Sequence, residues 1–501
     1  MKGNVLLIVP AVNPASQNKI INSIIIKTLP TSVGILAGFL DGRGVGIPRI
    51  IDEQINAIQD KDLPEIIASL EPPRIIGITV ITIGCWRAYD LAEKIKKIDP
   101  KAIIILGGIH PTVVPEEAFQ NGSVDVVVRG EGEETLLELV QAINNQMDFT
   151  KINGISFRSN GNIIHNPNRP LIKNLDEIPP FPYHLFEDNI SEYPSFGSII
   201  SSRGCPYNCI FCSSRSISGR KYRYFSVERT ISEIELLVDK YNQETIWFMD
   251  DNLGVNSKRF HGLLNGIIKR GLHKKARFIG SMRGDNVTDE ILDKAKAANF
   301  GTISCSIETG SERLMKVLNK GETVEQVAQA IRRIHQKGIS TSTAIIFGLP
   351  TETRGDRWKA IRLVRRLPLS SARFNTLTPY PGTPVYKMLN DQGKLKIKAD
   401  WKNFAVQYMW EGDDLPYVPD GNSRYELMFD TMFANLYFYL NIKGIMGMIK
   451  AGHAGALVIN LKEKWYLSPK ILWRFTKVFF YISRRFIYIT VKMISEKCSR
   501  K

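Results

Sequence analysis

The segment Gly204-Cys-Pro-Tyr-Asn-Cys-Ile-Phe-Cys212 places Cys205, Cys209 and Cys212 in a C-x3-C-x2-C pattern. A loop this short can bring three thiolates to one metal centre. Structural zinc sites and most iron–sulfur clusters have four protein ligands, but the next cysteine downstream is Cys305. The pattern therefore predicts a [4Fe–4S] cluster with three cysteine-bound irons and one open iron.

This spacing resembles that of the radical S-adenosylmethionine (SAM) enzymes. The resemblance implies that the open iron chelates the amino and carboxylate groups of SAM, and that the reduced cluster cleaves SAM to a 5′-deoxyadenosyl radical. It also implies that Phe211 lies close to the adenine. A zinc loop completed by His184 or Cys305 is the alternative, and the position of the cysteines directly after the apolar strand Ser198-Ile-Ile-Ser201 argues against it.

Residues 1–146 alternate strand and helix. Apolar runs predict strands at 5–9, 75–81, 102–106 and 124–128, and helical spacing predicts helices at 32–40, 89–98 and 133–143. Continuous apolar strands that alternate with helices are typical of a Rossmann-like parallel sheet covered on both faces. Ligands of such sheets bind at the carboxyl ends of the strands.

Two glycine-rich turns, Gly107-Gly-Ile-His-Pro-Thr112 and Arg129-Gly-Glu-Gly-Glu133, follow strands of this sheet. Glycine lets a ligand approach the backbone closely. These turns, followed about seventy residues later by the cysteines, resemble the cobalamin-binding domain of cobalamin-dependent radical SAM enzymes. The resemblance to these enzymes covers about residues 1–390. A nucleotide is the competing ligand, but neither G-x-G-x-x-G after the first strand nor a Walker loop occurs.

The resemblance implies a set of cobalamin contacts: Pro30, Thr79, Gly107, Gly108, His110, Pro111, Gly130, Glu131 and Gly132. The motif Asp-x-His-x-x-Gly, which supplies a lower axial histidine to cobalt, is absent. Cobalamin is therefore expected to bind with its own base displaced and without a protein imidazole on cobalt. His110 could still be an axial ligand, but a histidine that shapes its loop by local hydrogen bonds is the favoured interpretation.

Residues 147–195 are predicted to form a hairpin, turning at 159–161, and a proline-rich linker. Strand-like runs then recur at 197–201, 245–249, 276–281, 301–307, 342–347 and 372–376. About six βα units predict a partial (β/α)6 barrel of the TIM type over residues 196–390. Catalytic groups of such barrels lie at the carboxyl ends of the strands.

The resemblance also implies SAM contacts at these strand ends. Asp250 or Asp251 would accept hydrogen bonds from the amino group of SAM, and Arg283 would pair with its carboxylate. Glu308 would hold the ribose or the amino group, and Gly348 would let the backbone approach the adenine. The alternatives are a helix N-cap for the two aspartates and their neighbour Asn252, and a surface salt bridge for Glu308. Cys305 is expected in the core.

The net charge of +16 is concentrated near the C-terminus. Residues 431–501 contain 13 Lys and Arg against two Glu, which gives 13 − 2 = +11. No run of eighteen apolar residues occurs there, so a membrane-spanning helix is not expected. A helix over 467–493 would carry basic and tyrosine side chains on one stripe of an otherwise apolar body: Lys470, Arg474, Lys477, Tyr481, Arg484, Arg485, Tyr488 and Lys492.

Such a helix in the tail (residues 431–501) suits the surface of an anionic membrane. The alternative is a helix that packs its apolar face on the barrel and leaves its charges in water. Residues 391–430, with Trp401, Trp410 and Tyr417, are predicted to form a lid or substrate-side cap.

These features predict an α/β protein: a cobalamin-binding domain, a radical SAM barrel and a helical tail. The resemblance to cobalamin-dependent radical SAM enzymes implies the activity, which is expected to be methylation of an unactivated carbon of a small or lipid-like substrate. A cyclase or rearrangement enzyme and a non-catalytic cobalamin and Fe–S sensor are the alternatives. The expected partner is an external electron donor such as flavodoxin or ferredoxin, with no nucleic acid. Six cysteines in 501 residues suit the reducing cytoplasm. The basic tail adds the expectation of peripheral contact at the inner membrane face.

Overall fold

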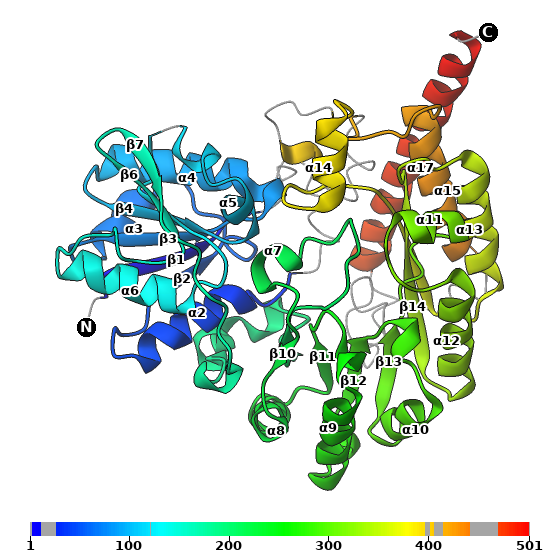
Figure 1. The fold of residues 1–501 in the computed structure, drawn as a ribbon, viewed down its shortest axis with the longest axis horizontal. Helices are drawn as coiled ribbons and strands as arrows, with labels where there is room; N and C mark the ends of the chain where they lie inside the picture. Colours follow the sequence, from blue (N-terminus) through cyan, green and yellow to red (C-terminus); the bar gives the residue numbers. More distant parts are fainter. Residues whose placement is uncertain are drawn as a thin grey trace.

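The computed structural model describes residues 3–11, 27–120, 122–395, 401–404, 414–440 and 469–499. Two α/β units lie side by side in Figure 1, an N-terminal unit in blue and cyan and a barrel-like unit in green and yellow. Helices of the C-terminal region pack on the far side of the second unit. The predicted α/β fold class is confirmed.

The N-terminal unit contains a seven-stranded sheet with the order β2-β1-β3-β4-β5-β6-β7. Its first five strands are parallel and the last two are antiparallel: β1 (Val5–Val9), β2 (Arg49–Asp52), β3 (Ile75–Thr79), β4 (Ile103–Gly107), β5 (Val126–Val128), β6 (Ile155–Ser159) and β7 (Asn162–His165). Helices cover both faces: α2 (Thr31–Gly42) and α6 (Glu133–Asn144) on one, α3 (Leu63–Ala68) and α4 (Cys85–Ile98) on the other.

Alternation along β1 explains the two cores of this sheet. Leu6 and Ile8 pack with α3 and α4, while Val5, Leu7 and Val9 pack with α2 and α6. Successive side chains of a strand point to opposite faces. A strand that is apolar at every position is therefore buried on both faces, as the sequence predicted.

The structure adds three features to the sequence prediction. The edge strand β2 and the six-residue helix α3 were not predicted, because β2 has only four residues, is polar at both ends and is at most partly buried, and α3 is too short to show a helical period. The predicted hairpin is present, with Asn160 and Gly161 at positive φ in its turn. Its strand β6 pairs with β5, so these residues extend the N-terminal sheet instead of standing apart as a linker.

The second unit is an open sheet of six parallel strands with the order β15-β14-β13-β12-β11-β8. Its strands are β8 (Ser198–Ile199), β11 (Thr245–Phe248), β12 (Arg277–Ser281), β13 (Phe300–Ser304), β14 (Ser340–Phe347) and β15 (Ser371–Thr376). The connecting helices are α8 (Val227–Glu235), α9 (Ser257–Lys269), α10 (Asp289–Ala297), α12 (Val324–Gln336) and α13 (Arg354–Arg366). Chain order equals spatial order, as expected for a partial barrel of βα units.

Shorter elements surround the strand ends. They are α5 (Ile109–Val113), the antiparallel pair β9 (Ser202–Arg203) and β10 (Arg223–Tyr224), α7 (Arg215–Ser218), α11 (Glu312–Val317) and α14 (Pro384–Asp391). In Figure 1, α7 and α14 lie between the two units.

Helix α15 (Arg424–Tyr439) covers the edge strand β15. The Asn435 side chain donates to the Phe374 carbonyl oxygen at 2.8 Å and accepts from the Phe374 N–H at 3.2 Å. The Tyr439 hydroxyl donates to the Ala372 carbonyl at 2.8 Å. Side chains of α15 thus satisfy backbone groups that an exposed edge would leave open to other strands.

Helix α17 (Pro469–Ser499) runs beside α15 (Figure 1). The rings of Phe429 and Phe486 stack at 5.2 Å, and Ile489 is fully buried. A second line of apolar side chains, Ile487, Val491 and Ile494, is exposed. The apolar body predicted for this helix is therefore divided, with one line packed on α15 and the other facing outward.

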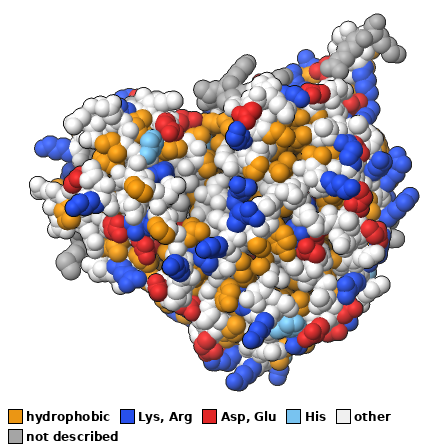
Figure 2. All heavy atoms as spheres, viewed as in Figure 1, with side chains coloured by type: hydrophobic (Ala, Val, Ile, Leu, Met, Phe, Trp, Pro, Cys, Tyr) orange, Lys and Arg blue, Asp and Glu red, His pale blue; other side chains and the backbone are white. Residues whose placement is uncertain are grey.

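Basic side chains accompany the exposed line. Arg484 and Lys492 are exposed, while the side chains of Lys470 and Arg474 lie outside the described residues. In Figure 2, Lys and Arg side chains lie along the side of the molecule from which α17 projects. Among the described residues, no helix is both long enough and apolar enough to cross a membrane.

The predicted cap region joins both units. Trp401 and Phe404 pack into the core of the N-terminal unit, although they follow the barrel in the chain. Tyr417 packs instead with Leu349 and Leu377 of the barrel. Trp410 lies outside the described residues.

A buried ion pair between α13 and α15 yields a stability prediction. Arg357 and Asp430 are both fully buried, with 2.8 Å between Nε and Oδ2. Asp430→Ala removes the nearest of three carboxylates around the buried Arg357 guanidinium, the other two lying at 3.5 and 3.6 Å. We therefore expect a loss of about 3 kcal/mol in the free energy of unfolding, the low end for a broken buried pair. Asp391→Ala, which removes an exposed pair with Lys387, should change it little. Urea denaturation of the two variants measures the difference, and equal losses would contradict the assignment.

Candidate active site

The cysteine loop connects β9 to α7, at the carboxyl end of the first barrel strand. Gly204 opens the loop at φ +82°, and a Cβ there would lie 2.4 Å from the Lys221 carbonyl oxygen, so only glycine fits. The Ile210 N–H donates to the Leu318 carbonyl at 3.0 Å, which ties the loop to α11. Phe211 is partly buried and packs against an apolar cluster that contains Leu318.

Cys205, Cys209 and Cys212 are free and half-buried. Burial raises the pKa of the Cys209 thiol to about 11. Among the described residues, the one trio of potential ligands with all ligand atoms within 4.8 Å of one another is Cys85, His110 and Glu117, not the loop cysteines. A single tetrahedral zinc ion would need sulfur atoms about 3.8 Å apart. The three loop sulfur atoms do not all lie within 4.8 Å of one another in this structure.

The two aspartates after β11 have different environments. Asp250 is buried and accepts from the Ser201 N–H at 2.8 Å, the Ser201 hydroxyl at 2.6 Å and the Ser202 hydroxyl. Burial raises the pKa of the Asp250 carboxyl. Asp251 is exposed, accepts from the Ser214 hydroxyl at 2.5 Å and lines a cavity. Of the two predicted SAM contacts, only Asp251 faces open space.

Neither aspartate caps the helix α9. Asn256 caps it, because its side chain accepts from the Arg259 N–H at 2.9 Å. Asn252 caps the short turn Leu253–Val255 and also bonds to Asn286. The N-cap alternative therefore applies to Asn252 alone, and only for this turn.

Arg283, the predicted partner of the SAM carboxylate, already has protein partners. Its guanidinium donates twice to Asp285, at 3.1 and 2.8 Å, and once to the Lys320 carbonyl at 2.7 Å. Its Cζ lies 3.5 Å from the centre of the Tyr207 ring, within the cysteine loop. Arg283 therefore supports the loop, and its charge is largely balanced without a ligand.

Glu308 forms a buried ion pair and not a surface one. It accepts from the Lys320 ammonium at 3.0 Å, and both side chains are less than 10% exposed. Its φ of +61° is strained for a side-chain-bearing residue, and such strain is concentrated at functional sites. Lys320 also donates to the Ser306 carbonyl at 2.6 Å. Lys320 was not predicted, since a single lysine in a loop gives no signal of burial in the sequence.

Gly348 follows β14 at φ +82°. Its N–H donates to Glu352, and a Cβ there would lie 3.0 Å from the Leu427 side chain of α15. Burial raises the pKa of the Glu352 carboxyl to about 8. The adenine contact of Gly348 stays a prediction, since the glycine faces Leu427 in this structure.

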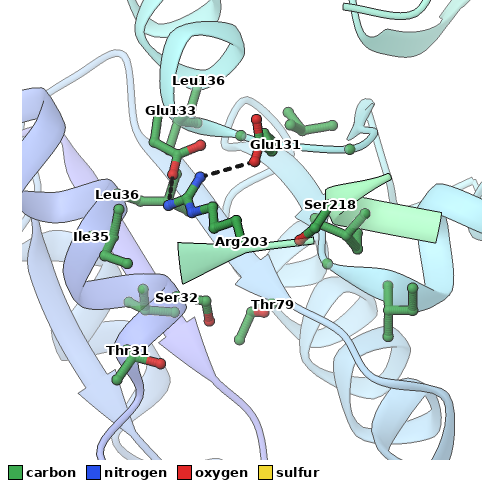
Figure 3. A pocket seen from close by; sticks show the side chains of 18 of the residues that line it. Thr31, Ser32, Ile35, Leu36, Thr79, Glu131, Glu133, Leu136, Arg203 and Ser218 are labelled. Atoms are coloured by element: carbon green, nitrogen blue, oxygen red, sulfur yellow. Dashed lines mark hydrogen bonds and ion pairs between the residues drawn. The ribbon is translucent and has the colours of Figure 1, made fainter. Parts of the chain in front are cut away.

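A cavity of about 410 Å³ lies where the strand ends of the two units meet. The N-terminal unit contributes Thr79 and the predicted glycine turns, and the barrel contributes Arg203, Ser214, Met249 and Asp251. Figure 3 shows Thr31, Ser32, Ile35 and Leu36 of α2 along one wall and Arg203 beside Glu131 and Glu133. Most other lining residues are apolar.

Of the two glycine turns, the second leaves this wall open, whereas the first is packed against the chain after β3. Gly130 has φ +77°, and a Cβ there would meet no described atom within 4 Å. Gly108 has φ +102°, and a Cβ there would lie 2.7 Å from the Val80 carbonyl. The described lining includes the predicted cobalamin residues Thr79, Gly107, Gly108, Gly130, Glu131 and Gly132, but not Pro30, His110 or Pro111. Bare backbone beside apolar side chains fits a bulky ligand such as a corrin.

His110 lies behind its turn and is fully buried. Its Nε2 is 3.2 Å from Glu117, which also accepts from the Trp401 indole N–H at 2.9 Å and the Tyr89 hydroxyl at 3.1 Å. The His110 and Trp401 rings meet edge to face at 5.1 Å. This geometry supports a loop-shaping histidine over an axial ligand.

His110→Ala therefore should leave the cobalt coordination unchanged, because the imidazole faces Glu117 and not the cavity. The expected result is a cob(II)alamin electron paramagnetic resonance spectrum equal to that of the wild type, with somewhat weaker cobalamin binding through a loosened loop. If nitrogen hyperfine splitting is present in the wild type and disappears in the variant, His110 is an axial ligand after all.

Two family models match the chain. The model of the radical SAM superfamily matches residues 199–364, and the model of the B12 binding domain matches residues 26–140. They correspond to the barrel with its cysteine loop and to the N-terminal sheet.

An uncharacterized methyltransferase of Pyrococcus horikoshii is 33% identical over 365 residues, which cover 72% of this chain and 78% of that protein. The anaerobic magnesium-protoporphyrin IX monomethyl ester cyclase of Rubrivivax gelatinosus is 28% identical over 428 residues, which cover 82% and 74%. The solved structure of the radical SAM methyltransferase TsrM from Kitasatospora setae, with cobalamin and a [4Fe-4S] cluster bound, matches with a TM-score of 0.69 at 18% identity, covering 91% of this chain and all of that one.

The predicted cofactors, a [4Fe–4S] cluster, SAM and cobalamin, are those of the family that these comparisons identify. The order of the two domains, the cysteine loop at the first barrel strand and the glycine turns at the facing sheet agree with it. The chain belongs to the cobalamin-dependent radical SAM enzymes.

Proposed function

We propose that this enzyme is a methyltransferase that methylates an unactivated carbon of a small or lipid-like substrate. The observation that carries the proposal is the shared cavity, since the glycine turns of the B12-binding domain and the end of the cysteine loop line the same space. A substrate in this cavity would touch both sites at once.

When bound, the cluster with SAM supplies a radical that abstracts hydrogen, and cobalamin supplies the methyl group. The residues of the chain hold these groups and exclude water. Asp251 is placed to accept hydrogen bonds from a cationic ligand, and the Glu308–Lys320 pair offers a carboxylate beside the cysteine loop. Arg283 supports the loop through Tyr207.

Cyclisation or rearrangement is the second candidate. It is favoured by the likeness to the cyclase of Rubrivivax gelatinosus, which is 28% identical. The two candidates differ in the product, because only a methyltransferase adds a carbon derived from SAM.

Mass spectrometry with methyl-labelled SAM separates these outcomes. Reduced, reconstituted enzyme should yield 5′-deoxyadenosine together with a labelled product from a cell extract of its source. The triple variant Cys205→Ala, Cys209→Ala, Cys212→Ala should lose the cluster and form neither compound. Deoxyadenosine without label in any product would favour the cyclase alternative. Deoxyadenosine formed by the triple variant would refute radical SAM chemistry.

For partners, we propose an external one-electron donor such as flavodoxin or ferredoxin, and the cytoplasmic face of an anionic membrane. The membrane proposal rests on α17, where Ile487, Val491 and Ile494 share one exposed stripe beside Arg484 and Lys492. Each basic residue near an anionic surface contributes about 1 kcal/mol.

Vesicle flotation tests the membrane contact. The triple variant Ile487→Ser, Val491→Ser, Ile494→Ser should lose most binding to phosphatidylserine vesicles, because the apolar stripe no longer inserts. The matched control Ile47→Ser, Ile98→Ser, Met147→Ser removes three exposed apolar side chains of the N-terminal unit and should bind like the wild type. High salt should weaken the binding of the wild type. Equal binding by the two triple variants would contradict the proposal.

A further inference from the structure

Four charged side chains from the two units meet at the rim of the cavity. Glu131 lies in the turn after β5 and Glu133 is the first residue of α6, while Arg203 belongs to β9 and Arg223 to β10. Figure 3 shows Arg203 between the two carboxylates. All four side chains are 5–12% exposed, so this ionic contact between the units is shielded from water.

The contacts fill the acceptor positions of Glu131. Arg223 donates to both carboxylate oxygens, at 2.9 and 2.8 Å. Arg203 donates to Oε1 at 3.2 Å, and the Ile172 N–H donates to Oε2 at 3.0 Å. A carboxylate has about four lone-pair sites, so these four bonds leave Glu131 little capacity to bind cobalamin. This geometry therefore suits Glu131 better as an ion-pair partner that joins the two units than in its predicted role as a cobalamin contact.

Arg203 has a second partner in the N-terminal unit. It donates from Nη2 to Glu133 at 2.5 Å, in addition to its bond with Glu131. Burial by itself would raise the pKa of Glu131, but the bonds and charges of Arg223 and Arg203 outweigh it and lower that pKa. The two arginines thus favour the charged form of Glu131.

The position of the network in the chain connects the two cofactor sites. Glu131 lies within the Gly130–Gly132 turn that lines the cavity, and Arg203 immediately precedes Gly204 and Cys205. One side-chain contact therefore links the turn on the cobalamin side to the start of the cysteine loop. Bidentate arginine–carboxylate pairs fix orientation as well as distance, which an apolar contact would not.

We propose that Glu131, Arg203 and Arg223 are positioning residues that set the distance and orientation between the cobalamin site and the cluster site. This inference rests on the proposed function, because the two sites must reach one substrate from opposite sides of the cavity. Productive geometry tolerates displacements of only about 0.5 Å. Weakening these ion pairs should therefore change the distance between the two cofactors without releasing either cofactor.

The test measures the separation of the cofactors and needs no substrate. Wild-type protein is reconstituted with its cluster and with cobalamin, and both are reduced to paramagnetic states. Pulsed electron paramagnetic resonance then records how far the reduced cluster accelerates the relaxation of cob(II)alamin, an effect that falls steeply with distance. Iron and cobalamin content per chain are measured on the same samples.

Glu131→Gln and Arg203→Lys are the informative variants. The first retains the shape of the side chain, and the second retains its charge but loses the planar fork. We expect both to retain full cluster and cobalamin content but to show a relaxation enhancement that differs from the wild type by at least twofold, with a broader distribution. Asp99→Asn, which weakens a partly buried pair with Arg74 inside the N-terminal unit, is the matched control and should show the wild-type value.

Unchanged relaxation in both loaded variants would overturn the proposal. Loss of cobalamin from Glu131→Gln with unchanged relaxation in Arg203→Lys would also overturn it, because Glu131 would then bind cobalamin directly. A wild-type protein that fails to take up both cofactors would refute the proposed function itself, and this outcome is visible before any variant is compared.

Discussion

Parallel strand pairing in both sheets is the constraint on which the rest of the structure depends. In a parallel sheet every strand ends at the same edge, so the loops that follow the strands gather there. The two units turn these edges toward one cavity, which places the turns after β4 and β5 opposite the cysteine loop after β8. Two binding sites separated in the chain thereby become one reaction space.

Charges buried near this space are balanced within the protein. Desolvation of an isolated charge is costly, so a buried ion persists where partners surround it. Asp250 is held by two serines, Arg283 by Asp285, and Glu308 by Lys320. Several side chains of types that suit SAM therefore already have partners within the protein. Of the two adjacent aspartates, Asp251 is the one that faces the cavity.

The region after the barrel binds the two units together. Side chains of α15 satisfy the edge strand β15, and α17 packs on α15 in turn. Trp401 crosses back to the N-terminal unit and donates to Glu117, which also holds His110 behind the glycine turn. The cap region therefore stabilises the wall of the cavity from behind.

The sequence by itself determined the fold class, the cysteine loop and most of the strands, because these depend on local patterns: apolar runs, glycine turns and the spacing of thiols. It did not reveal the four-residue edge strand β2 or the short helix α3, which have little periodic signal. Only the tertiary structure decided which of Asp250 and Asp251 is buried and that Glu131 faces two arginines seventy or more residues away. The physical reason is that residue type fixes which bonds a side chain can make, whereas burial and partners depend on chain segments that meet only in the folded state.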